Sequence, residues 1–166
     1  MRGWCLGVMN QPAEGVATLL QGLTIYRTTG ANLLIPFYLS ALAEVYGKAS
    51  QPEEGLCRLA EAAKLAEMTQ ERWVEAEIHR LRGTLLVSMD ECPAAEDSYR
   101  HALTVAQRQG AKFWELRAAL DLARLWRDQG KRTEAHDLLA PIYGWFTEGF
   151  DTPVLQDAKA LLDELA

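Results

Sequence analysis

The chain has three histidines, His79, His101 and His136. Histidine is the commonest transition-metal ligand and a frequent general base. The sequence has no HExxH motif and no two histidines four residues apart. The helices predicted below place His79 on the first helix of a pair and the other two on second helices, so a metal site requires them to converge from different repeat units. We therefore expect surface or groove histidines, no metal site and no cofactor.

Other catalytic signatures are also missing. Ser40 and Ser88 fall inside predicted helices and outside the GxSxG motif of hydrolases. The three cysteines form no CxxC pair. The Gly-Lys pairs at 47–48 and 130–131 lack the upstream glycine and the following Ser or Thr of a phosphate-binding loop. These observations predict that the chain is not an enzyme.

Composition restricts the partners and the compartment. The chain has 166 residues, a formal net charge of −6 and 49% hydrophobic residues, so it suits one ordinary domain. The negative charge argues against nucleic-acid contact. No segment reaches the roughly 18 apolar residues of a membrane span. The odd number of cysteines without metal spacing favours a reducing, cytoplasmic location.

A repeat of 40 residues organises the chain without a single gap. Five columns of residues keep their class at this spacing, which argues against a generic helical bundle. The columns are Gly3, Ala43, Gly83 and Ala123 (small); Leu6, Tyr46, Leu86 and Trp126 (large); Asn10, Ser50, Asp90 and Gly130 (turn-forming); Gly15, Gly55, Ala95 and Ala135 (small); and Leu19, Leu59, Tyr99 and Leu139 (large).

Each repeat unit predicts two antiparallel helices. Gly83, Leu86, Ala95, Tyr99 and Ala102 are similar to the tetratricopeptide (TPR) pattern, in which a small residue precedes a large one by three and the second helix carries A-x3-aromatic-x2-A. The usual period is about 34 residues, so both helices should be longer here. The predicted fold is all-α: a right-handed, TPR-like α-solenoid of antiparallel helix pairs with a C-terminal capping helix.

The register divides the chain into one repeat domain, 1–166. Its predicted parts are a partial unit 1–30, the units 31–70, 71–110 and 111–150, and a cap helix 152–165. The first helix of the partial unit should begin before Met1, so we expect the chain to be the C-terminal piece of a longer protein. Trp4 and Leu6 would then be exposed, and this open apolar end suggests a homodimer.

First helices line the concave face of a TPR stack, so their exposed rows define a candidate partner-binding groove. The candidate residues are Phe37, Ser40, Glu44, Glu77, Arg80, Thr84, Arg117 and Arg124. Arg80, Arg117 and Arg124 would form a local basic cluster suited to a peptide carboxylate. The alternative is a solvated face with intrahelical salt bridges such as Glu77–Arg80.

Several segments resemble the C-terminal repeat region of large bacterial regulators. They are Glu71-Arg72-Trp73 with Glu75-Ala76-Glu77, His79–Gly83, Trp114–Ala119, and Glu134-Ala135 with Leu138–Thr152, of which Tyr143–Thr152 is the most specific part. Those regulators join an adenylate/guanylate cyclase or a winged-helix domain to a predicted ATPase of the AAA/STAND type and then to TPR units. The resemblance implies a non-catalytic interaction scaffold, the repeat arm of a signalling ATPase. The alternative is a sensor whose groove binds a peptide or small ligand.

Overall fold

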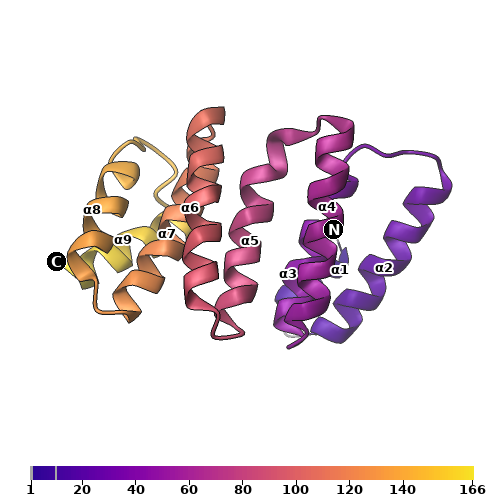
Figure 1. The fold of residues 1–166 in the computed structure, drawn as a ribbon, viewed down its shortest axis with the longest axis horizontal. Coiled ribbons are helices and arrows are strands. Elements are labelled where there is room, and N and C mark those ends of the chain that lie inside the picture. Colours follow the sequence, from indigo (N-terminus) through magenta and orange to yellow (C-terminus); the bar gives the residue numbers. More distant parts are fainter. Residues whose placement is uncertain (1, 10) are drawn as a thin grey trace.

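The computed structural model describes residues 2–9 and 11–166, which form a row of helix pairs along one axis (Figure 1). The helices are α1 (Arg2–Val8), α2 (Pro12–Thr28), α3 (Ile35–Lys48), α4 (Pro52–Thr69), a 3-10 turn η1 (Arg72–Val74), α5 (Glu75–Val87), α6 (Cys92–Gln109), α7 (Lys112–Asp128), α8 (Arg132–Tyr143) and α9 (Pro153–Leu165). None of the helices in these described ranges has the length and hydropathy needed to cross a bilayer.

The turn-forming column ends the first helix of each described pair in the same way. Ser50, Asp90 and Gly130 have positive φ angles of 56°, 62° and 79°. The next residue's N–H then donates to a carbonyl five residues back, as from Gln51 to Tyr46. This left-handed C-terminal turn satisfies carbonyls that the helix leaves free. Asn10, the first member of the column, lies outside the described residues.

The small columns set how closely paired helices approach. A Cβ atom added to Gly83 of α5 would lie 2.6 Å from the Tyr99 ring of α6. One added to Gly55 of α4 would lie 2.7 Å from Leu85 of α5 and 3.0 Å from the Ala43 carbonyl of α3. Glycine at these positions therefore permits the tight packing of each pair and of successive units.

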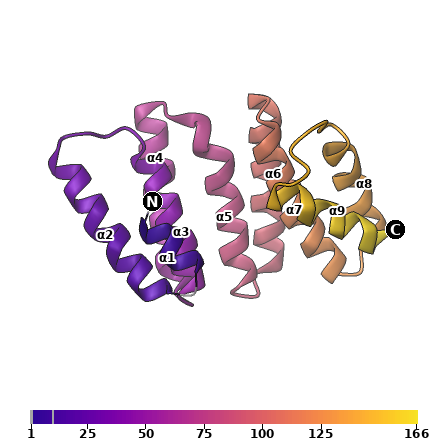
Figure 2. The same ribbon diagram turned by 180° about the vertical axis from the view of Figure 1, so that it is seen from behind.

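The two largest apolar clusters of the core meet at α5. Leu81 and Leu85 pack with α2, α3 and α4, whereas Leu86 packs with α6 to α9. The odd-numbered helices α1, α3, α5, α7 and α9 contact one another in order, so they form one continuous face. Figure 2 shows α1 and α9 at the two ends of this face. We call it the first-helix face.

The helical spacing of apolar residues predicts first helices at 34–48, 73–89 and 113–129, and second helices at 12–29, 52–68, 93–109 and 132–146. The structure agrees with these limits to within two residues, with two exceptions. The helix predicted from Trp73 begins as the 3-10 turn η1 and becomes α-helical at Glu75. The helix predicted to reach Phe146 ends at Tyr143. The expectation of exposed Trp4 and Leu6 was also wrong, because both are half-buried against their neighbours.

Candidate functional site

Two adjoining hollows lie on the first-helix face between α3 and α5. The first, of about 210 Å³, is lined by Trp4, Phe37, Ser40, Ala41, Glu44, Glu77, Leu81, Trp114 and Arg117. The second, of about 270 Å³, is lined by Glu44, Gly47, Lys48, Arg80, Leu81, Thr84, Leu85 and Ser88. They share Glu44 and Leu81, so together they form an elongated trough, which we call the α3–α5 trough.

Aromatic side chains form the walls of the first hollow. The Phe37 ring lies 5.5 Å from the ring of Trp73, which is 42% exposed. Trp4 donates its indole N–H to Glu44 Oε2 at 2.7 Å. The Arg117 guanidinium lies 5.4 Å from the centre of the Trp114 ring, within cation–π range. In this hollow Trp4 and Glu44 therefore satisfy each other, and the Trp114 ring lies against the Arg117 guanidinium.

An ion network crosses the same face next to the trough. Glu77 accepts two hydrogen bonds from Arg80, both at 2.8 Å, and its Oε1 lies 3.0 Å from Arg117. Arg80 also donates to Asp121, a carboxylate of α7. The members of the network are Glu77 and Arg80 of α5, Arg117, Asp121 and Arg124 of α7, and Asp157 of α9. Three arginines meet three carboxylates, so their formal charges cancel.

Burial makes this network a structural feature. Glu77 and Arg80 are each less than a tenth exposed. Burial alone lowers the pKa of Arg80, but the charges and hydrogen bonds of Glu77 and Asp121 outweigh it and raise that pKa above its ordinary value. Burial, with the charge of Asp121, also raises the pKa of Tyr99 to about 12. Arg80 is therefore charged and Tyr99 neutral at pH 7.

The structure brings seven of the eight predicted groove residues to the trough. Arg124 is the exception: it lines neither hollow and pairs with Asp121 and, at 2.7 Å, with Asp157. The expectation of a basic cluster free to bind a carboxylate does not fit this arrangement, since Arg80, Arg117 and Arg124 all have acidic partners. The alternative was a solvated face with salt bridges such as Glu77–Arg80; that salt bridge is present, but the pair is buried and not solvated.

The other predicted residues have specific partners in the trough. The Ser40 hydroxyl is buried and donates to the Pro36 carbonyl at 2.8 Å. Thr84 donates to the Arg80 carbonyl and accepts from Tyr99. Their polar groups are therefore satisfied by the protein itself, which leaves the apolar walls as the surface offered to a partner.

Sequence reasoning missed four residues that line the first hollow. They are Trp4, Ala41, Leu81 and Trp114. Trp4 stands 40 residues before Glu44, so extending that row by one unit identifies it. Ala41 and Leu81 belong to the row two residues before the small column. Trp114 stands at the start of α7, nine residues before Ala123, and so lies outside the predicted groove rows.

A second cluster lies on the other side of α5. Glu75 and His79 occupy successive turns of α5, and His101 projects from α6; one ligand atom from each residue lies within 4.8 Å of the others. The two imidazole rings are 4.1 Å apart. The expectation that histidines converge only across units was wrong here, because α5 and α6 form one pair. Burial, then His101 and Arg82, lower the pKa of His79 to about 4.

Comparison with known proteins gives no family model that matches the chain. An uncharacterized protein of Rhizobium meliloti strain 1021 is 31% identical over 124 residues, which are 74% of this chain and 12% of that protein. The chain thus spans a small part of the length of this relative.

Solved structures decide the fold class. A putative kinesin light chain of Podosopora anserina, with nearly identical TPR-like repeats, superposes with a TM-score of 0.70 over 98% of this chain and 81% of that chain, at 16% identity. A variant of the same protein gives 0.71. The chain has a TPR-like fold. The predicted all-α solenoid of helix pairs is confirmed.

Proposed function

We propose that the chain is a non-catalytic scaffold that binds an extended segment of a protein partner in the α3–α5 trough. The observation that carries this proposal is the shape of the trough, two adjoining hollows that share Glu44 and Leu81. An elongated depression suits an extended peptide, whose successive side chains enter successive hollows. The TPR-like fold is consistent with this use.

The chemistry of the walls indicates which side chain the partner supplies. Phe37, Leu81 and Trp114 offer apolar surface, while the network around Glu77 satisfies its own charges. A large apolar or aromatic side chain of the partner therefore gains most by entering the first hollow, because Glu77 and Arg117 are paired there and Glu44 accepts the hydrogen bond of Trp4.

The alternative of a small-ligand sensor has less support from the geometry. Compact ligand sites usually enclose about 300 to 1,000 Å³. Each hollow of the trough, of about 210 and 270 Å³, is below this range by itself, and the two reach it only when joined along the length of α3 and α5. This favours the extended segment over a compact effector.

Selection of peptides from a random displayed library tests the proposal. We expect recovered peptides to share a large apolar residue, and Trp114→Ala to weaken their binding at least about tenfold, as for central interface aromatics. Trp145→Ala is the matched control, because Trp145 is 58% exposed and lies outside the trough. Equal loss of binding in both variants, or recovered peptides without an apolar anchor, would contradict the proposal.

The setting that we propose is the cytoplasmic repeat arm of a bacterial signalling ATPase. Its support is the resemblance of segments such as Tyr143–Thr152 to the repeat regions of those regulators. The reading frame that encodes the chain tests it: a phosphate-binding loop in the same frame supports this setting, and a frame without ATPase or cyclase motifs contradicts it.

The proposed homodimer uses the end of the solenoid at α1 and α2. A mostly apolar hollow of about 320 Å³ there is lined by Arg2, Gly3, Thr18, Leu19, Gly22, Leu23, Tyr26 and Tyr38. Light scattering after size exclusion measures the mass directly. A dimer that becomes monomeric in Thr18→Glu, a half-buried position of this hollow, supports this end as the interface, and a monomer at every concentration rules it out.

A further inference from the structure

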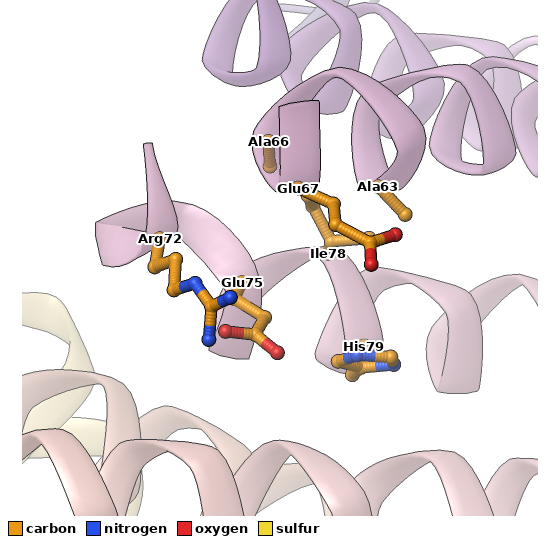
Figure 3. Close-up of a pocket in the computed structure, with 7 residues that line it drawn as sticks. All are labelled: Ala63, Ala66, Glu67, Arg72, Glu75, Ile78 and His79. Atoms are coloured by element: carbon orange, nitrogen blue, oxygen red, sulfur yellow. The ribbon is translucent and has the colours of Figure 1, made fainter. Parts of the chain in front are cut away.

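The cluster of Glu75, His79 and His101 lies outside the α3–α5 trough and has no part in the proposed function. It borders a hollow of about 320 Å³ between α4 and α5 that is lined by Ala63, Ala66, Glu67, Arg72, Glu75, Ile78 and His79. Figure 3 shows Glu75 and His79 on successive turns of α5, with Glu67 on α4 across the hollow. His101 is exposed on α6, so solvent reaches the cluster.

The donor atoms are those of a familiar metal-binding set. Two imidazoles and one carboxylate can occupy one side of a Zn²⁺ ion and leave further positions open for water or another ligand. The spacing of four residues between Glu75 and His79 places both on one helical face. The third donor comes from the antiparallel partner helix, so an ion at this point would tie α5 to α6.

The carboxylate of Glu75 is incompletely satisfied. Its Oε2 atom is buried and makes no hydrogen bond with the described residues. The Arg108 guanidinium lies 3.5 Å away as an ion pair, and Arg108 is itself 61% exposed. A buried carboxylate oxygen without a hydrogen bond is costly unless a cation or water completes it.

The distances permit coordination after small side-chain rotations. Ligand atoms around a tetrahedral Zn²⁺ lie about 3.4 Å apart, since each is about 2.1 Å from the metal. The observed limit of 4.8 Å therefore has to shrink by about 1.4 Å at most. His101 is exposed, so its side chain can rotate toward the ion while its ring stays beside that of His79.

We propose that Glu75, His79 and His101 form a binding site for a divalent transition-metal ion, with Zn²⁺ as the ion that fits the donor set. Arg72, Arg82 and Arg108 surround the cluster and weaken the attraction for a cation. An anion is the weaker candidate despite these arginines, because the carboxylates of Glu67 and Glu75 face the same hollow.

Titration calorimetry with Zn²⁺ on the whole chain tests this site. We expect one ion per chain in the wild type, and binding more than tenfold weaker in His101→Ala, whose exposed side chain is not needed for folding. Glu75→Gln should weaken binding similarly. His136→Gln on α8 is the matched control, since His136 lies outside the cluster, and it should bind as the wild type does.

Two further measurements separate this site from adventitious binding. Arg108→Gln removes a cation from beside Glu75, so Zn²⁺ should bind several-fold more tightly. The absorption of bound Co²⁺ should lack a thiolate charge-transfer band, because no cysteine belongs to the cluster. Absence of binding, unchanged binding in His101→Ala and Glu75→Gln, or a thiolate band would each overturn the proposal.

Discussion

The two sides of α5 carry similar groups in different states of pairing. On the trough side, Glu77 is 7% exposed and binds Arg80 and Arg117. On the other side, Glu75 is 28% exposed, and its buried Oε2 has an ion pair but no hydrogen bond. A carboxylate whose oxygens are all paired, such as Glu77, stabilises the fold, whereas one with an unpaired oxygen, such as Glu75, is a candidate for binding.

Arg80→Met gives the largest expected effect, because it removes the common partner of the buried Glu77 and the half-buried Asp121. Breaking a buried pair from one side costs about 3 to 5 kcal/mol. Urea unfolding followed by circular dichroism measures the loss. Arg82→Met on the exposed face of α5 is the control, and equal unfolding midpoints for the two variants would show that the network does not support the fold.

Gly83→Ala tests the close approach of α5 and α6, on which both sides of the comparison depend. The added methyl meets the buried Tyr99 ring at 2.6 Å, and overpacking of this kind costs about 1 to 3 kcal/mol. Zn²⁺ affinity should fall as well, because α5 moves away from His101. Gly22→Ala has no atom within 4 Å and should stabilise its helix by about 0.5 to 1 kcal/mol. A stabilised Gly83→Ala variant would refute the packing argument.

Glu75→Gln should change the free energy of unfolding least, and so tests the difference between the two sides of α5. Without metal we expect a stability change within about 1 kcal/mol, since the pair with Arg108 is long and partly exposed. Glu77→Gln should cost several times more. Thermal melts with and without Zn²⁺ complete the test, because the ion should raise the melting temperature of the wild type and not that of Glu75→Gln. Equal losses in the two metal-free variants would remove the distinction between the two sides.

The fold follows from the sequence because periodicity and turn chemistry act locally. The 40-residue columns predict the helix pairs, and the Ser50–Asp90–Gly130 column has the predicted turn role. The row of groove residues is also recoverable, since all but Arg124 line the trough.

The partners of the side chains could not be predicted from the sequence, because those partners lie on neighbouring helices. From the sequence alone Arg80 is expected to be an exposed cation, but in the structure it pairs with Asp121 of α7. The sequence does not predict a contact between His79 and His101, which lie side by side because α5 and α6 pack closely at Gly83. The 40-residue repeat predicts which residue type stands at each helix position. It does not predict which side chains meet, because that depends on the angle and distance at which two helices cross.

The polar contacts between helices share one further property. In the described ranges, the side-chain hydrogen bonds reach no further along the chain than the 41 residues from Arg80 to Asp121. Trp4 to Glu44, Leu34 to Glu71 and Arg127 to Glu164 span 40, 37 and 37 residues. Folding therefore closes only loops of about one unit, so structure can nucleate in any helix pair and spread to its neighbours, and unfolding should proceed as fraying from the two ends.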